Sequence, residues 1–208
     1  MSRIFDTLFA TYPALENCRA DINAAFEILL NTAKNGTVLV CGNGGSASDS
    51  EHIVGELMKG FNLKRPLSED DLNRFEEGDR ESMGKGLQYG IRAISLVSQT
   101  GLMTAFMNDC DPALVFAQQV FAYAQNKDDT LIALSTSGNS KNVVNAVKAA
   151  RAAGIRTVAI TGENESALSA LADVTVKLPA HTPFEVQEFT LPVYHALCAA
   201  IEAELFEV

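Results

Sequence analysis

Positive charge is scarce in this sequence. Its 208 residues include 16 Lys and Arg against 26 Asp and Glu, so the formal net charge is -10 at pH 7. An acidic chain repels a phosphate backbone, and we therefore expect no nucleic-acid partner. Small phosphorylated ligands are not excluded, because backbone amides and hydroxyls bind phosphate without a basic surface.

Long apolar runs and cysteine pairs are also missing. No apolar run approaches the roughly 18 residues that a membrane span needs. The first residues carry an acid, Asp6, and no signal-peptide hydrophobic region. We therefore expect a cytoplasmic protein with no membrane partner. The four cysteines lack CxxC spacing, which in a cytosolic chain indicates reduced, mostly buried thiols, and Cys41 lies in an apolar run that favours an inert thiol.

What the sequence does contain is a regular alternation of apolar, β-branched runs and helical patterns. This alternation predicts a parallel sheet with helices on both faces. We expect an α/β fold, a three-layer sandwich with a five-stranded parallel sheet of the flavodoxin-like type, as a single domain over residues 1–208. The expected strands are 37–41, 93–97, 130–135, 156–161 and 174–178. The expected helices are 46–60, 111–125, 139–153, 166–172 and 184–205.

Residues 1–36 form a helical segment that precedes the alternation. Pro13 should break or start a helix there, and the apolar residues after it recur at helical spacing. Because the segment lies outside the strand–helix alternation, we expect its apolar stripe to be an oligomer contact; the alternative is that it packs on the chain's own sheet. The stripe consists of Leu15, Ile22, Phe26 and Leu29.

Residues 65–88 also depart from the alternation. The stretch is polar, acidic and glycine-bearing, and we interpret it as an insertion within the domain. It is either a solvated surface segment with at most one helical turn, or a lid or oligomer contact near the site, since long loops are often functional.

Two loops rich in glycine and hydroxyls each follow a predicted buried strand and open a helix. They are CGNGGSAS at 41–48 and STSGNS at 135–140. Glycines let a ligand approach the backbone, and a helix N-terminus presents free amides to an anion. Ligands of open parallel sheets bind beyond the carboxyl ends of the strands, so both loops can share one phosphorylated ligand. The first loop also fits the dinucleotide pattern, but the acid expected about 20 residues later is absent, which disfavours a nicotinamide cofactor.

Two pairs of polar side chains lie on predicted helix faces. His52 and Glu56 are four residues apart and Gln187 and His195 are eight apart, so each pair shares one face. Imidazole and carboxylate groups suit zinc, while glutamine is a less usual ligand. Taken alone, a His–Glu pair at this spacing is typical of a helix surface.

Together, these motifs are similar to those of the bacterial phosphoheptose isomerases of the sugar isomerase (SIS) domain superfamily. The resemblance covers nearly the whole chain outside 65–88, and the conjunction of motifs outweighs the surface-pair interpretation. It implies a cytoplasmic homotetramer with sites at subunit interfaces, one zinc ion per subunit, and conversion of sedoheptulose 7-phosphate to D-glycero-D-manno-heptose 7-phosphate. The motifs are the CGNGGS loop, His52, Glu56, Asn108, Asp109, the STSGNS loop, Gln187 and His195.

The resemblance also implies a role for each of these residues. The implied zinc ligands are His52, Glu56, Gln187 and His195. The implied substrate contacts are Asn43, Gly44, Gly45, Ser46, Glu56, Asn108, Asp109, Ser135, Thr136, Ser137, Ser140 and Gln187.

Aldose–ketose exchange moves one proton between adjacent carbons and another between their oxygens. We assign Glu56 as the base and His195 as the acid, with Asp109 as the next candidate base. Zinc would position both groups and polarise the substrate oxygens, although a carboxylate bonded to zinc is a poorer base. His181 is expected to be a loop residue rather than a third catalytic histidine.

Two alternatives stay open at the level of sequence. The family's chain between the positions of Glu56 and Asn108 is much shorter, so the 65–88 insertion bears on substrate identity, and the same loops would suit an isomerase of another sugar phosphate. The second alternative is a non-catalytic SIS binding module, either a sugar-phosphate sensor or a replication-initiator-binding protein. An initiator-binding relative lacks the equivalents of Glu56 and His195, which favours the isomerase.

Overall fold

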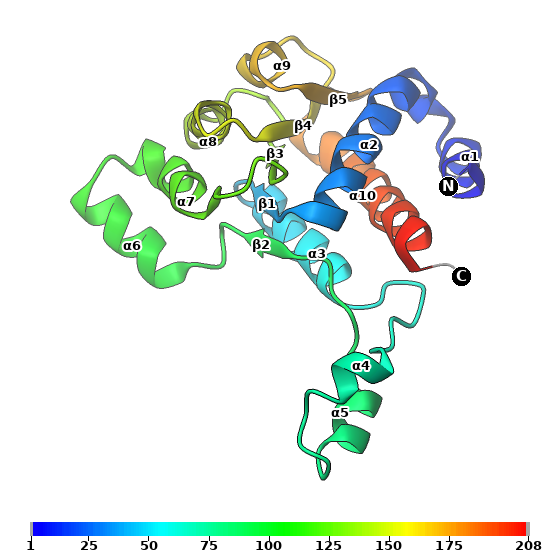
Figure 1. Cartoon of the computed structure of the whole chain (residues 1–208). Helices are drawn as coiled ribbons and strands as arrows, with labels where there is room; N and C mark the ends of the chain where they lie inside the picture. Colours follow the sequence, from blue (N-terminus) through cyan, green and yellow to red (C-terminus); the bar gives the residue numbers. More distant parts are fainter. Residues whose placement is uncertain (1, 207–208) are drawn as a thin grey trace.

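The computed structural model describes residues 2–206. Its centre is a sheet of five parallel strands in the order β2-β1-β3-β4-β5 (Figure 1). This order confirms the expected flavodoxin-like α/β fold. The strands are β1 (Val38–Cys41), β2 (Ala93–Ser95), β3 (Thr130–Leu134), β4 (Arg156–Gly162) and β5 (Val174–Leu178).

Helices surround this sheet and supply the other two layers. The α-helices are α1 (Ser2–Thr11), α2 (Arg19–Asn35), α3 (Gly45–Met58), α4 (Glu69–Leu72), α5 (Arg80–Gly86), α6 (Thr100–Asp109), α7 (Val115–Tyr123), α8 (Lys141–Ala152), α9 (Ala167–Leu171) and α10 (Pro183–Phe206). Two 3-10 helices are η1 (Pro13–Cys18) and η2 (Pro112–Leu114).

Successive side chains of each strand point to opposite faces of the sheet and pack into two separate hydrophobic cores. Val38 and Val40 of β1 point to the core shared with α2, α3 and α10, whereas Leu39 and Cys41 point to the core shared with α7, α8 and α9. All residues of β1 and β3 are buried, as expected of strands covered on both faces. Burial also raises the pKa of the Cys41 thiol to about 12, in line with the inert thiol we expected.

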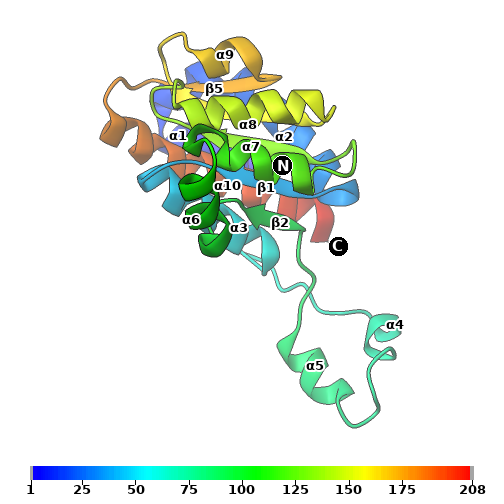
Figure 2. The ribbon, with the colours of Figure 1, turned by 90° about the vertical axis from the view of Figure 1, so that its left-hand side faces the viewer.

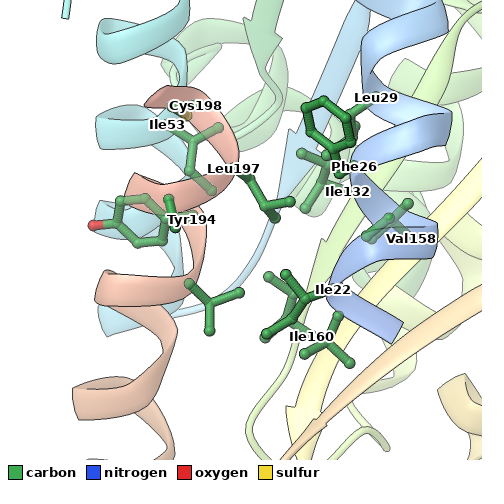
Figure 3. Packing of buried hydrophobic residues seen from close by; sticks show 14 of the residues in the cluster. Ile22, Phe26, Leu29, Ile53, Ile132, Val158, Ile160, Tyr194, Leu197 and Cys198 are labelled. Carbon is green, nitrogen blue, oxygen red and sulfur yellow. The ribbon is translucent and has the colours of Figure 1, made fainter. Parts of the chain in front are cut away.

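The N-terminal stripe packs on the chain's own sheet. Ile22 and Phe26 of α2 face Ile132 and Val158 of the central strands (Figure 3). The stripe residues are 0–2% exposed, so they present no surface to another subunit. The prediction that this stripe is an oligomer contact is therefore wrong, because these side chains cover one face of the chain's own sheet.

Helix α10 is the one helix of residues 2–206 that is long and apolar enough to cross a membrane by length and composition. We had expected no segment to approach that limit. Of its most apolar window, 56% is buried inside the protein, where α10 packs against α2 and α3. Its apolar composition is therefore explained by its place in the core.

The insertion forms an arm that extends away from the body of the molecule (Figures 1 and 2). It contains two short helices, α4 and α5, where we expected at most one helical turn. The two ends of the arm lie side by side, because an antiparallel bridge joins Pro66 to Gln88 and the Tyr89 amide donates to the Arg65 carbonyl at 2.7 Å. Between 66 and 88 no residue is buried, which matches the solvated character of the sequence.

One helix was missed by the sequence patterns. Helix α6 follows β2 and has no buried residue. Asn108 and Asp109 are its last residues. The expected strands and the other long helices agree with the structure to within a few residues.

Candidate active site

The two phosphate-loop candidates meet at one edge of the sheet. β1 and β3 are parallel neighbours with Cys41 opposite Ala133, so the loops that follow them start side by side. Asn43 and Asn142 join the loops, since each side-chain amide donates to the other's Oδ1 at 2.9 Å. The connections leave in opposite directions between β1 and β3, and such switch points are where open α/β sheets bind ligands.

Backbone geometry explains the glycines of the first loop. Gly44 immediately precedes α3 and has φ +57°, a conformation that side chains other than glycine disfavour. A Cβ on Gly45 would lie 2.4 Å from Nε2 of Gln187. Gln187, in the first turns of α10, therefore lies directly against the start of α3.

The second loop gathers hydroxyl groups before α8. Ser135 Oγ donates to Ser140 Oγ at 3.1 Å, and Gly138 turns the chain with φ +65°. Ser135 is buried, Thr136 is half-buried and Ser137 is exposed. Hydroxyls beside a helix N-terminus make an uncharged cradle for phosphate.

Helices α3 and α10 lie side by side and bring three titratable side chains together. Beyond Gln187 on α10, His195 packs edge-on against His52, with ring centroids 5.0 Å apart. His52 Nε2 lies 3.2 Å from Oε1 of Glu56. The residues assigned as base and acid, Glu56 and His195, thus come from adjacent helices and interact electrostatically.

Burial lowers the pKa of His195, and the neighbouring His52 lowers it further, while the Glu56 carboxylate acts in the opposite direction. The net effect favours a neutral imidazole, which can donate and accept a proton. Glu56 is only 12% exposed, and its second carboxylate oxygen lies 3.1 Å from Lys59 Nζ.

Sequence patterns missed two residues that contact or neighbour His52, namely Tyr194 and Asp49. The Tyr194 hydroxyl lies 2.9 Å from His52 Nδ1 and 3.3 Å from Asp49 Oδ1. Burial raises the pKa of the Tyr194 phenol, and the Asp49 carboxylate adds to that shift, so the phenol keeps its proton. The only available signal was the spacing of Asp49 and His52, three residues apart on one face of a helix.

A buried ion pair fixes the far end of the same two helices. Arg65 Nε donates to Glu202 Oε1 at 2.8 Å, and both side chains are at most 1% exposed. The Arg65 guanidinium also donates to the carbonyls of Leu57 at 2.7 Å and Glu56 at 3.4 Å, at the C-terminus of α3. Since Glu202 belongs to α10, this pair ties the helix of the base to the helix of the acid. Its partners lie 137 positions apart, beyond any spacing argument.

The donor atoms beside α3 and α10 suit zinc in type. His52 and His195 offer imidazole nitrogens, Glu56 a carboxylate and Gln187 an amide oxygen. His195 Nε2 is buried and has no hydrogen-bond partner among residues 2–206, which fits a nitrogen reserved for a metal. The side chains are not gathered into a closed site as they stand. Within the described part of the chain, no three His, Cys, Asp or Glu groups are arranged to hold a metal ion.

Other predicted residues lie outside this cluster. The amide of Asn108 donates to Asp109 Oδ1 at 2.8 Å, and both residues are exposed at the end of α6, with no hydrogen bond to either loop in the described structure. His181 precedes α10 and pairs with Glu163 at 3.1 Å on the surface, as expected of a loop residue.

Comparison with known proteins covers almost the whole chain. SIS domain family models match residues 83–203 and 10–85. The phosphoheptose isomerase of Aromatoleum aromaticum is 36% identical over 94% of this chain and 88% of its own length. That of Helicobacter pylori strain P12 is 35% identical over 91% and 86%. The solved structure of phosphoheptose isomerase GmhA from Neisseria gonorrhoeae superposes with a TM-score of 0.73 at 28% identity, covering 97% of this chain and 98% of that one.

The similarity extends through nearly the full length of each protein, so it describes a whole enzyme and not a shared fragment. The chain belongs to the phosphoheptose isomerase family of SIS domain proteins.

Proposed function

We propose that the protein isomerises sedoheptulose 7-phosphate to D-glycero-D-manno-heptose 7-phosphate. The observation that carries this proposal is the cluster of His52, Glu56 and His195 on α3 and α10, in which the His52 ring contacts both the Glu56 carboxylate and the His195 ring. His52 lies seven residues beyond the loop end of α3, a helical rise of about 10 Å. We infer that a sugar chain held by its phosphate at the loops extends along α3 and places its first two carbons towards the cluster of His52, Glu56 and His195.

In this mechanism the chain's own residues move two protons. Glu56 removes a proton from C1 of the ketose while the C2 oxygen takes a proton from His195, which gives an enediol. Glu56 then returns its proton to C2, and His195 takes the proton of the C1 oxygen, which leaves the aldehyde. Ser135, Ser137 and Ser140 with the amides of their loop would hold the phosphate throughout.

We include one zinc ion in each subunit's site in this proposal. When bound, it supplies a Lewis acid beside the substrate oxygens. His52, Glu56, Gln187 and His195 would hold it, and the buried, unpartnered His195 Nε2 supports their assignment. The remaining substrate contacts proposed by resemblance are those of the first loop together with Asn108 and Asp109, which the chain alone does not bring to the loops.

The setting of the enzyme is also proposed. We infer a single SIS domain over residues 1–208, a cytoplasmic location and a homotetramer whose sites lie at subunit interfaces. The exposed position of Asn108 and Asp109 supports sites that another subunit completes.

Incubation of purified protein with a panel of ketose phosphates of five, six and seven carbons tests the function. We expect new aldose phosphate from the heptulose substrate. Faster turnover of a pentose or hexose phosphate would reassign the substrate. Tight binding of a sugar phosphate without turnover would favour the non-catalytic binding module.

A further inference from the structure

A polar group of three side chains lies behind the candidate base. Asp49 and His52 come from α3, and Tyr194 comes from α10. The Tyr194 ring belongs to the apolar cluster, and its hydroxyl points out of that cluster (Figure 3). Tyr194 is 2% exposed, so the hydroxyl is held by its neighbours more than by solvent.

The hydrogen bonds of this group constrain where the protons lie. A carboxylate only accepts hydrogen bonds, and a phenol has one proton to donate. Among residues 2–206, the Tyr194 hydroxyl is the side-chain donor that reaches Asp49, at 3.3 Å. If the hydroxyl donates to Asp49, its oxygen must accept from His52 Nδ1, 2.9 Å away, and the neutral imidazole then carries its proton on Nδ1.

The other ring nitrogen of His52, Nε2, faces the candidate base Glu56. With the proton on Nδ1, the lone pair of Nε2 faces Glu56 Oε1 at 3.2 Å. The Nε2 lone pair and the Glu56 carboxylate oxygen are then two acceptors facing each other. This contact is repulsive without a cation and favourable when a cation binds between or beside them. The opposite tautomer would let His52 donate to Glu56 and would remove the lone pair that a metal needs.

We propose that Asp49 and Tyr194 are positioning residues that hold His52 in the Nδ1–H tautomer, so that Nε2 is kept as a ligand for zinc. The inference rests on the proposed function only for the identity of the metal. In the metal-free chain, the hydrogen bonds from His52 Nδ1 to Tyr194 and from Tyr194 to Asp49 must hold this tautomer against the repulsion between Nε2 and the Glu56 carboxylate. Ring contacts reinforce the geometry, since the Tyr194 ring lies 5.5 Å from that of His52 and 5.0 Å from that of His195.

Nitrogen NMR of the imidazole rings tests the tautomer directly. The protein is labelled with ¹⁵N-histidine, stripped of metal and kept at about pH 8, above the ordinary histidine pKa. His181→Gln and His195→Gln variants assign the three rings. We expect the His52 signals of the wild type to show a protonated Nδ1 and an unprotonated Nε2. A protonated Nε2 in the wild type would overturn the proposal.

Two substitutions then separate the members of the group. Tyr194→Phe keeps the packed ring and removes the hydroxyl, so both tautomers of His52 should become populated. Asp49→Asn adds a donor that can reach the phenol oxygen, which frees the phenol to donate to Nδ1 and should shift His52 towards the Nε2–H tautomer. An unchanged His52 spectrum in both variants would contradict the relay.

Zinc affinity, measured by competition with a chromophoric chelator, is the second readout. We expect each variant to bind zinc about 10- to 100-fold more weakly than the wild type, the range typical of residues that orient a metal ligand. Tyr123→Phe, a surface tyrosine at the end of α7, is the matched control and should bind as the wild type does. If Tyr194→Phe binds zinc as tightly as the wild type and melts at the same temperature, Tyr194 does not help His52 to bind the metal. Absence of turnover in the wild type would contradict the proposed function and leave the tautomer result intact.

Discussion

Glu56 and His195 are the proposed base and acid, so substitutions that keep their shape should isolate the proposed proton transfer. We expect Glu56→Gln and His195→Gln each to lower kcat by about 100- to 10,000-fold, the usual contribution of a general acid or base. Because both act on one enediol, the double variant should be little worse than either single variant. Turnover of a ketose phosphate is the measurement.

Metal content and a thermal melt must accompany those rates, since either substitution can also lose zinc. Full activity in Glu56→Gln with metal retained would exclude Glu56 as the base. Asp109 would then need to reach the site from another subunit, because in its own chain it lies at the exposed end of α6.

Gly45 is constrained by the Gln187 side chain rather than by its own backbone. We expect Gly45→Ala to displace Gln187, since the new Cβ would lie 2.4 Å from Nε2, and to raise KM or lower zinc affinity while the fold persists. Gly55→Ala on the same helix has nothing within 4 Å and is the control. It should stabilise the protein by about 0.5–1 kcal/mol through helix propensity. Equal kinetics for Gly45→Ala and wild type would show that the Gln187 position is unimportant.

At the scale of elements, α3 and α10 are joined by the buried Arg65–Glu202 pair. Burial acts to raise the pKa of Glu202, but hydrogen bonds from the amides of Phe61 and Asn62 and from Arg65 outweigh it, so the net pKa is lowered. A carboxyl whose folded pKa is lowered stabilises the fold fully above its unfolded pKa, and this contribution is lost as pH falls through the folded pKa.

Glu202→Gln should therefore destabilise the protein by about 3–5 kcal/mol near pH 7, because it leaves the Arg65 charge buried and unpaired. The difference between variant and wild type should shrink as pH falls below 4.5, the ordinary glutamate value. Urea unfolding of both proteins, at pH values from about 7 to about 3, measures this difference in the free energy of unfolding. A difference that stays constant with pH would mean that Glu202 is not ionised in the folded protein.

Elements differ in how far the sequence predicts them. The five strands and both loops were predictable because the central strands β1 and β3 are buried along their whole length and the other strands still leave short β-branched runs between helical patterns. Helix α6 was not, since it buries none of its residues and so leaves no core-facing pattern. Contacts between α3 and α10, such as those of Tyr194 and Arg65, depend on how two helices align in space. Spacing along one helix gave His52 and Glu56 but not the partners that orient them.

At the scale of the whole molecule, apolar side chains remain exposed on α6, η2 and α7. Phe121 is 72% exposed, and Leu102, Met107 and Leu114 are each about 40% exposed. We expect this surface to be covered in the proposed homotetramer, so light scattering at micromolar concentration should give about four times the 22.3 kDa chain mass. Phe121→Glu should lower that mass. Phe184→Glu is the control, because Phe184 is an exposed residue in the first turn of α10; it tests whether a charge at any exposed phenylalanine has the same effect. A wild-type mass of one chain would contradict the tetramer.

The arm between 66 and 88 leaves and re-enters the body at adjacent points, where Pro66 pairs with Gln88. An excursion whose ends meet leaves the order and register of the sheet untouched, whatever its length. Doubling a flexible excursion costs only about 0.6 kcal/mol in closure entropy. Length can therefore be gained or lost at this point almost without a thermodynamic penalty, while Arg65, one residue before it, remains bound to Glu202. At the point where the arm joins the body, proteins of one family can therefore differ in the length of the inserted segment and still share the same sheet and hydrophobic core.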